Sequence, residues 1–384
     1  MNDFFISIIL TTKCNLKCLY CVNDSGSALI PNNSLINEWE SEKDIIDCLI
    51  NISKARNIDV IKFYGGEPLL KSEMIIKILD AKCEFSRNNN VKFALTTNAY
   101  DKIEEKLLKK FMEHNVILNI SLDGPEMLHN AYRKTNDDGN CYRGVMYNLE
   151  QLKKSNFAFS LVSVLDKRVI DYNYTLVDLA LFLSKYTPVY KIDPVYEINK
   201  TTIRQNIIEN LLKMQRDLIR IIFESILSLE EDKYIYENNI LLTINSIVHK
   251  NKKEYVCSAS DMLAIFPNKN TFSCHNLMNE NFLISNDISK ESPMSINNIL
   301  NEKKELLRMD NFSSKYKEIE LYGSDYCPLE NNFTSFAYQY RKHMIINVSD
   351  NLLKITQGSA EHLSLLNYIN KGFLNPFQKN IKSL

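Results

Sequence analysis

Two hydrophobic patterns alternate along the first half of this 384-residue chain. Short runs rich in β-branched and aromatic residues alternate with longer segments whose apolar residues recur at helical spacing, an order typical of βα units around a parallel sheet. The predicted strands cover residues 4–11, 60–64, 91–96, 116–122, 157–165 and 189–195. The predicted helices cover residues 40–55, 73–85, 102–114, 145–153 and 173–185. We therefore expect an α/β fold over residues 1–195, as an open sheet or a partial barrel.

The pattern changes after residue 195. Residues 203–229 and 234–248 carry apolar residues at helical spacing, and we interpret 196–250 as a helical bridge that packs on the first domain. A hairpin is predicted from residues 262–266 and 271–273, and the tail from residue 334 is expected to be mostly helical. The third predicted region is thus a small α+β domain with terminal helices over residues 251–384.

Composition limits the classes of function. The chain is 45% hydrophobic and 24% charged with a net charge of −1, so we expect no nucleic-acid or membrane partner. No segment approaches the roughly 18 apolar residues that span a bilayer. The N-terminal sequence lacks the basic flank and cleavage site of a signal peptide. We expect a reducing, anaerobic cytoplasm, where free cysteines are more readily metal ligands than disulfides.

Three cysteines follow the first predicted strand directly. Cys14, Cys18 and Cys21 are spaced by four and three residues, which lets their thiolates converge on one face of a compact loop. Such a set suits three irons of a four-iron cluster. The fourth iron would lack a local protein ligand and could bind a small molecule, as catalytic zinc sites keep an open position. A zinc knuckle, or three unrelated buried cysteines, is the alternative interpretation.

The CxxxCxxC spacing, with Tyr20 before its last cysteine, resembles the radical S-adenosylmethionine superfamily. A second segment, Gly65-Gly66-Glu67-Pro68 after the second strand, is similar to that family's GGEP motif. The resemblance implies a partial (β/α)6 barrel and a [4Fe–4S] cluster whose open iron is chelated by the amino and carboxylate groups of S-adenosylmethionine. It also implies reductive cleavage of this cofactor to a 5′-deoxyadenosyl radical, which abstracts hydrogen from a substrate.

The family's cofactor contacts can be carried over to the ends of the first four predicted strands, where catalytic groups of such sheets gather. The resemblance assigns ten residues to S-adenosylmethionine: Tyr20, Asn23, Gly65, Gly66, Glu67, Pro68, Asn98, Ser121, Asp123 and Arg133. Glu67 is expected at the amino group and Arg133 at the carboxylate, through a bidentate contact. Arg143 is close enough in sequence to be confused with Arg133, and a plain surface cation is the alternative.

The same resemblance implies that Ser121 and Asp123 contact the ribose, whereas an Asp-Gly-Pro turn by itself would be only a turn. Tyr20 and Asn23 flank the cluster motif and are expected to border the adenine; an exposed loop aromatic is the alternative. Asp193 ends the sixth predicted strand, where family members carry similar residues near the substrate, but the sequence assigns it no role.

Three further cysteines lie in the C-terminal region. Cys257 precedes the predicted hairpin and Cys274 closes it, which resembles the opening of the SPASM or twitch extension, where cysteines ligate an auxiliary iron–sulfur cluster. Only Cys327 remains of the later family segment, so the cysteine count excludes a two-cluster extension. The three would hold one auxiliary [4Fe–4S] cluster, with an open iron or a fourth ligand from Ser324, Asp325 or His275. Alternatively, the domain has no cluster and Cys327 donates a hydrogen atom to a substrate radical.

The resemblance implies a radical enzyme, and the C-terminal hairpin favours a ribosomally made peptide or a protein side chain as substrate. Cross-linking, oxidation and epimerisation stay open as outcomes. A dehydrogenase of a sugar or an aminoglycoside is the second interpretation, and an iron–sulfur electron carrier or a peptide-binding module without turnover is the third. An electron donor such as ferredoxin or flavodoxin is expected as a partner. Because the chain starts at its first strand, any leader peptide is expected to bind a separate protein or the C-terminal region.

Overall fold

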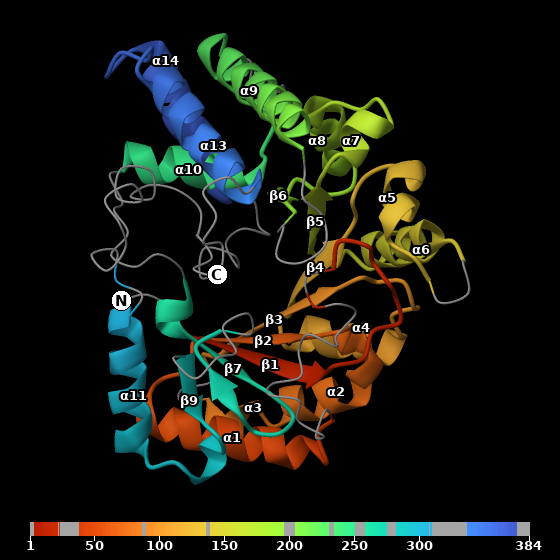
Figure 1. The fold of residues 1–384 in the computed structure, drawn as a ribbon, viewed down its shortest axis with the longest axis vertical. Helices are drawn as coiled ribbons and strands as arrows, with labels where there is room; N and C mark the ends of the chain where they lie inside the picture. The colour runs from red at the N-terminus through yellow and green to blue at the C-terminus, as the bar shows by residue number, and fades with distance from the viewer. Residues whose placement is uncertain are drawn as a thin grey trace.

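The strands predicted in the first half of the chain form one parallel sheet (Figure 1). The computed structural model describes residues 4–21, 23, 38–86, 90–135, 139–195, 204–229, 234–249, 258–274, 282–306, 308 and 336–374. Within these residues, the sheet contains β1 (Phe5–Thr11), β2 (Val60–Gly65), β3 (Lys92–Thr97), β4 (Ile117–Ser121), β5 (Phe159–Leu165) and β6 (Tyr190–Pro194). Each strand pairs in parallel with the next one along the chain. The α/β fold class is thereby confirmed.

The predicted hairpin is present and continues the same sheet. β7 (Met262–Ile265) pairs in parallel with β1, and β8 (Thr271–Phe272) and β9 (Leu283–Ser285) follow in antiparallel order. Among the described residues the strand order is β6-β5-β4-β3-β2-β1-β7-β8-β9. The C-terminal hairpin therefore shares hydrogen bonds with the first strand of the chain, while the three-region division stays a prediction.

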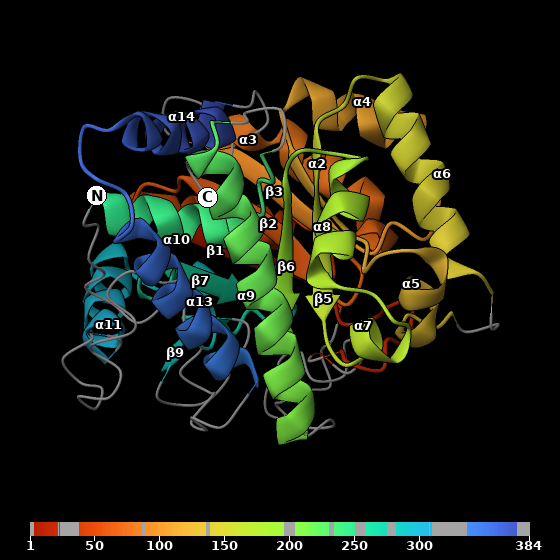
Figure 2. The same ribbon diagram turned by 90° about the horizontal axis from the view of Figure 1, so that it is seen from above.

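Helices follow the strands and pack on the outer side of the sheet (Figures 1 and 2). Those of the first half are α1 (Glu42–Ala55), η3 (Pro68–Lys71), α2 (Ser72–Asp80), α3 (Lys82–Phe85), α4 (Glu105–Glu113), α5 (Glu126–Tyr132), α6 (Cys141–Lys154), α7 (Arg168–Asp171) and α8 (Leu176–Ser184). The helix predicted over 73–85 is divided at Ala81, whose ψ of 7° leaves the helical range. Helices α5 and α7 were not predicted, because each is too short for its apolar residues to repeat at helical spacing.

The first helix shows how the local sequence fixes an element. Ser41 and Asp44 form a capping box at its start, which satisfies backbone N–H groups that have no partner within the helix. Asp44 and Lys54 also complement the helix dipole at opposite ends. Ile45 and Leu49 are fully buried, and their four-residue spacing places them on the side that faces the core.

Long helices dominate the second half. They are α9 (Gln205–Leu227), α10 (Asn238–Val248), α11 (Pro293–Leu306), α13 (Phe336–Leu352) and α14 (Ala360–Leu374), with the short turns η6 (Ser258–Asp261) and η8 (Ile288–Lys290). α9 packs against α8, α13 and α14, and α10 packs against β6, whereas α11 packs against α1. Both helices of the predicted bridge and the helical tail are present. Within the described ranges, no helix is long and apolar enough to cross a membrane.

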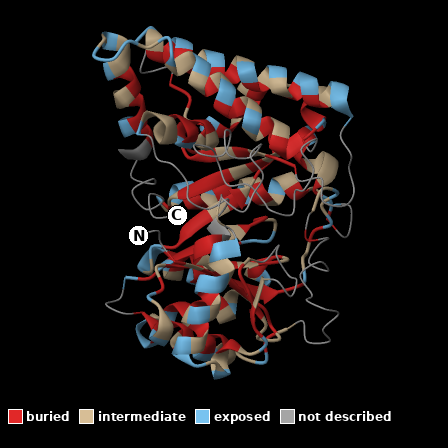
Figure 3. Cartoon of the chain, turned by 60° about the vertical axis from the view of Figure 1, so that its left-hand side comes forward, coloured by how far each residue is buried: buried red, intermediate tan, exposed pale blue. Residues whose placement is uncertain are grey.

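The two faces of the sheet differ in chemistry. Alternate residues such as Ile61, Phe63, Leu118 and Ile120 are fully buried in the main hydrophobic core beneath the outer helices (Figure 3). The residues between them point to the opposite face and are mostly polar and partly exposed. We call this opposite side the inner face; its polar members include Lys62, Tyr64, Asn119, Ser121, Lys191 and Asp193.

Candidate functional site

The cysteine loop, residues 12–21, leaves the end of β1 and is held by backbone hydrogen bonds. The N–H of Lys17 donates to the carbonyl of Lys134 at 2.7 Å, and the N–H of Leu19 donates to the carbonyl of Tyr132 at 2.9 Å. These contacts fasten the loop to the segment at the end of α5. Its cysteines are all partly exposed and form no disulfide: Cys14, Cys18 and Cys21.

The glycines of the GGEP segment pack against this loop. The N–H of Gly66 donates to the carbonyl of Thr11 at 2.9 Å, and that of Glu67 donates to the carbonyl of Lys13 at 2.8 Å. A Cβ atom at Gly66 would lie 2.1 Å from the Lys13 carbonyl oxygen, so only glycine fits. Gly66 therefore lies against the backbone that carries Cys14. The contacts that the resemblance assigns to Gly65 and Gly66 with the cofactor stay a prediction.

Glu67 connects three strand ends. It is 2% exposed, and its carboxylate accepts hydrogen bonds from the Thr97 hydroxyl at 2.7 Å and the Asn98 N–H at 2.8 Å. It also accepts from the N–H of Leu69 at the start of η3, which Pro68 begins. Burial raises the pKa of Glu67 to about 7, although these hydrogen bonds oppose the shift. Glu67 is therefore poised between its charged and neutral forms near neutral pH.

Asn98 links Glu67 to the cysteine loop. Its side-chain amide donates to Asn15 Oδ1 at 2.8 Å and approaches Cys14 Sγ at 3.8 Å. The Cys14 sulfur also accepts the N–H of Leu16 at 3.4 Å. The end of β3 thus helps to orient the first cysteine, and Asn15, which the motif reading overlooked, belongs to the same site.

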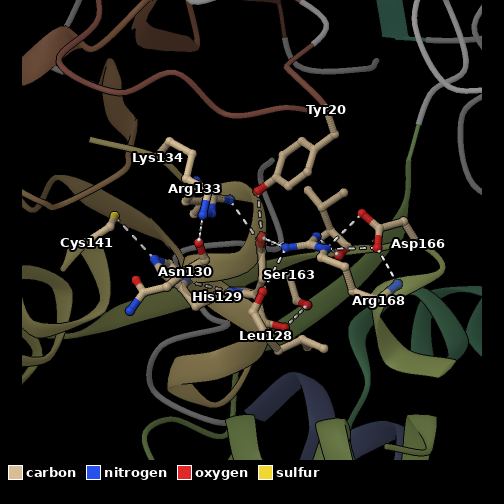
Figure 4. A network of polar contacts seen from close by, with 12 residues as sticks. Tyr20, Leu128, His129, Asn130, Arg133, Lys134, Cys141, Ser163, Asp166 and Arg168 are labelled. Atoms are coloured by element: carbon tan, nitrogen blue, oxygen red, sulfur yellow. Dashed lines mark hydrogen bonds and ion pairs between the residues drawn. The ribbon is translucent and has the colours of Figure 1, made fainter. Parts of the chain in front are cut away.

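Asp123 is the centre of a buried ionic network after β4. Figure 4 shows its partners Tyr20, Arg133 and Arg168 converging from three sides. Its carboxylate pairs with Arg133 at 3.0 Å and with Arg168 at 2.9 Å, and it accepts the hydroxyl hydrogen of Tyr20 at 2.6 Å. Burial disfavours the charged form of Asp123. The two guanidinium groups more than offset this effect and hold its pKa below the usual range. Ser121, at the end of β4, is partly exposed on the inner face.

The structure separates the two arginines that the sequence could confuse. Arg133 is 6% exposed, lies 5.4 Å from the Tyr20 ring centroid and has a buried Nε without a hydrogen-bond partner. Arg143 is exposed at the start of α6. Of these two arginines, only Arg133 is thus placed beside the cysteine loop, with a donor still free for a ligand.

Arg168 is the main site residue that sequence reasoning missed. Its guanidinium pairs with Asp166 at 2.8 Å as well as with Asp123, and lies 4.9 Å from the Tyr20 ring centroid. Asp166 directly follows β5, so the rule that polar groups gather at strand ends would have pointed to this segment. His129 lies beneath the network: its Nδ1 accepts the Asp123 N–H at 3.2 Å, and its Nε2 lies 3.4 Å from Cys141 Sγ.

Asn23 joins the loop to the inner face by donating to the Tyr64 hydroxyl at 3.0 Å. Lys62, two residues before Tyr64 on the same face of β2, lies close enough to Lys191 and Asp193 of β6 for their charges to influence its pKa. Cys274, after β8, is partly exposed and also lies close enough to influence the pKa of Lys62. The other residues of the predicted auxiliary site lie outside the described residues: Cys257, Cys327, His275, Ser324 and Asp325. The auxiliary cluster and the hydrogen-donor role of Cys327 stay predictions.

The residues present fit an iron–sulfur cluster with a bound organic cation. Burial raises the pKa of Cys14 to about 12 and that of Cys18 to about 11, so these thiols need a positive partner such as iron to ionise. In the part of the chain described, no three His, Cys, Asp or Glu side chains converge on a single ion. Each thiolate of a four-iron cluster binds its own iron, so the three cysteines need not converge on one ion.

Comparison with known proteins agrees with this geometry. Residues 8–180 match the family model described as the Radical SAM superfamily. The chain is 27% identical over 264 residues to an uncharacterised protein of Methanocaldococcus jannaschii, covering 68% of this chain and 87% of the relative. It is 26% identical over 289 residues to the radical SAM cyclopropyl synthase TigE of Paramaledivibacter caminithermalis, and the match covers 70% of this chain and 57% of TigE.

Among solved structures, "Native anSMEcpe with bound AdoMet" superposes with a TM-score of 0.71 at 16% identity, over 96% of this chain and 99% of that one. A second structure of anSMEcpe holds AdoMet and the Cp18Cys peptide, with a TM-score of 0.68 at 15% identity over 96% of this chain and 99% of that one. At this identity the likeness concerns the fold.

A parallel sheet with a three-cysteine loop after β1 and a GGEP segment after β2 defines a class of iron–sulfur enzyme that uses S-adenosylmethionine. Residues 8–180 form a domain of the radical SAM superfamily. Its cofactors are a [4Fe–4S] cluster and S-adenosylmethionine.

Proposed function

We propose that this radical SAM enzyme modifies a ribosomally made peptide or a protein side chain. The observation that carries the proposal is the superposition of 96% of the chain on a fold whose solved structure holds both AdoMet and a peptide. The hairpin β7–β8 pairs with β1 at the edge of the catalytic sheet, which supports the same substrate class. The sequence similarity to the cyclopropyl synthase TigE adds support over 70% of the chain.

In this proposal, Cys14, Cys18 and Cys21 hold the cluster. The bound cluster and S-adenosylmethionine together supply the one-electron chemistry that removes a hydrogen atom from the substrate. Glu67, fixed by Thr97 and Asn98, presents a carboxylate near the cysteine loop where it can attract the cofactor's ammonium group.

Asp123 and its arginines shape the other side of the cofactor site. The free Nε of Arg133 is a buried donor suited to the cofactor carboxylate. Tyr20, which donates to Asp123, presents its ring beside that arginine, and Asn23, Ser121 and the remaining GGEP residues complete the proposed contacts. The protein's contribution is to orient substrate and cofactor and to keep water away from the reacting atoms.

The proposal includes partners and a location. A low-potential donor such as ferredoxin or flavodoxin supplies the electron, a separate protein binds the leader of the substrate peptide, and the enzyme works in the cytoplasm. An auxiliary cluster at Cys257, Cys274 and Cys327 is part of the same proposal.

Anaerobic reconstitution tests the function. The purified protein is loaded with iron and sulfide, reduced with dithionite and given S-adenosylmethionine together with short peptides encoded beside its gene. We expect 5′-deoxyadenosine and a peptide whose mass has changed. Cleavage of the cofactor with an unchanged peptide, but with conversion of a sugar or an aminoglycoside, would favour the small-molecule dehydrogenase. No cleavage under any condition would favour the electron carrier or the binding module.

A further inference from the structure

Lys62 is a cation on the inner face that the cofactor site does not use. It lies on β2 and is only partly exposed. Its register partners are Ser7 on β1 and Ala94 on β3, both of which have small side chains. In the described part of the chain, Lys62 forms no ion pair, and its nearest partner is the Tyr64 ring, whose centroid lies 5.4 Å from Nζ.

The curl of the sheet brings a second strand to face Lys62. β6 is four positions away from β2 in the strand order, yet Lys191 and Asp193 of β6 both influence the pKa of Lys62. Three strands separate the two, so this influence acts across the concave side of the sheet rather than between neighbours. Cys274 acts on Lys62 from the hairpin side.

The carboxylate that faces Lys62 already has partners. Asp193 pairs with Lys191 at 2.6 Å and accepts a hydrogen bond from Asn239 at 3.1 Å. Among the described residues, Lys62 is therefore left as a cation without a counter-ion. Burial lowers its pKa to about 8, and the neighbouring charge of Lys191 adds to this effect. At neutral pH the amine is still mainly protonated, so it keeps an unmet attraction for an anion.

The position of this cation relates it to substrate rather than to cofactor. Tyr64, two residues further along β2, accepts the hydrogen bond from Asn23 beside the cysteine loop. Lys62 lies about 6.6 Å deeper along the strand than Tyr64, on the same face. A group held by Lys62 would thus lie beneath the proposed adenine contacts, inside the curl of the sheet.

We propose that Lys62 is a specificity-determining residue that binds a carboxylate of the peptide substrate. The carboxylate would belong to an acidic side chain near the reacting residue or to the C-terminus of the peptide. The bound carboxylate would supply the missing counter-ion. Because the ammonium is partly shielded from water, the charge-assisted hydrogen bond between the two groups would be strong. This inference rests on the proposed function, because it names the chemistry of the substrate of the same site.

The test measures peptide retention by the reconstituted holoenzyme with S-adenosylmethionine bound. The probes are four synthetic peptide mixtures of equal chain length, with or without Asp and Glu and with a free or an amidated C-terminus. Retained peptides are separated by anaerobic ultrafiltration and identified by mass spectrometry. The variants are Lys62→Met, Lys62→Arg and the control Lys92→Met, which removes an exposed lysine at the start of β3.

We expect the wild type to retain carboxylate-bearing peptides preferentially. Retention of the amidated mixture that contains Asp and Glu would identify an acidic side chain as the ligand. Retention of the mixture with a free C-terminus and without Asp and Glu would identify the C-terminal carboxylate. Lys62→Met should weaken this retention by at least about thirtyfold. Lys62→Arg should keep part of it, and Lys92→Met should match the wild type. Equal retention by Lys62→Met and wild type, or a wild type without preference, overturns the inference and leaves the peptide function standing.

Two further outcomes separate other failures. If the wild type retains no peptide and modifies none, the proposed function fails and the inference fails with it. If Lys62→Met loses S-adenosylmethionine in equilibrium dialysis, Lys62 belongs to the cofactor site and the inference is overturned. Should Lys62→Met fail to fold, Lys62→Gln, which also removes the charge, takes its place and should show the same loss of retention.

Discussion

The phenol hydroxyl of Tyr20 donates a hydrogen bond to the carboxylate of Asp123 at 2.6 Å and so ties the cysteine loop to the end of β4. Tyr20 is separated from Asp123 by 103 residues. Arg133 and Arg168 hold the same carboxylate and lie within 5.4 Å and 4.9 Å of the Tyr20 ring centroid. The buried ionic network therefore helps to position the cysteine loop, together with the backbone hydrogen bonds from Lys17 and Leu19.

Arg168→Met should break this network. It leaves Asp123 with a single arginine and Asp166 without its buried partner, so we expect the free energy of unfolding to fall by about 3–5 kcal/mol. Binding of S-adenosylmethionine should weaken by about ten- to a hundredfold, because a supporting contact is lost. Urea unfolding and equilibrium dialysis measure the two effects. Arg220→Met, which removes an exposed ion pair with Glu224, is the control and should change neither.

Replacing Cys14, Cys18 and Cys21 together with Ala should remove the cluster and abolish formation of 5′-deoxyadenosine. Cys83→Ala, at an exposed cysteine in α3, is the control and should keep both iron and activity. Counting iron in the triple variant also tests the auxiliary site. About four residual irons would support an auxiliary cluster, and none would reject it. Continued cleavage of the cofactor by the triple variant would contradict the assignment of the cysteine loop.

Gly66→Ala should displace the cysteine loop, because the added Cβ would meet the Lys13 carbonyl oxygen at 2.1 Å and the Cys14 nitrogen at 3.0 Å. We expect a loss of roughly 1–3 kcal/mol in the free energy of unfolding, together with a lower iron content after reconstitution. Gly372→Ala is the control, since its Cβ would meet Leu241 Cδ2 at 2.6 Å between α14 and α10, away from the cysteine loop. It should lose stability but keep its iron; equal iron loss in both variants would argue against a specific role of Gly66.

Glu67 should make stability depend on pH. Burial raises its pKa in the folded protein to about 7 from an ordinary value of 4.5. The folded state then binds more protons than the unfolded state between these values, so the free energy of unfolding falls as the pH rises from 4.5 to 7. The fall attributable to Glu67 is roughly 3 kcal/mol.

Urea unfolding of the cluster-free protein at several pH values measures this slope. In Glu67→Gln the free energy of unfolding should fall by roughly 3 kcal/mol less over this pH range than it does in the wild type. This difference should appear whatever the absolute stability of the variant. Glu73→Gln, at an exposed carboxylate of α2, should keep the wild-type slope. Parallel slopes for wild type and Glu67→Gln would show that Glu67 does not change protonation in this range.

Local sequence determined the elements of this protein and the order of its motifs. The period of the apolar residues predicted all six parallel strands of the first half, and the spacing of Cys14, Cys18 and Cys21 after β1 predicted the cluster loop. The GGEP segment could be placed after β2 for the same reason. Strand periodicity and motif spacing depend on neighbouring residues, so they can be read without knowing the fold.

Only the tertiary structure decided which residues meet. Arg168 joins Asp123 across 45 residues, and Gly66 lies against the backbone of the cysteine loop at Lys13. Lys62 faces Asp193 because the sheet curls, and the pairing of β7 with β1 joins segments that lie far apart in the sequence. Such contacts depend on the twist of the sheet and on long-range packing, which no local pattern of residues encodes.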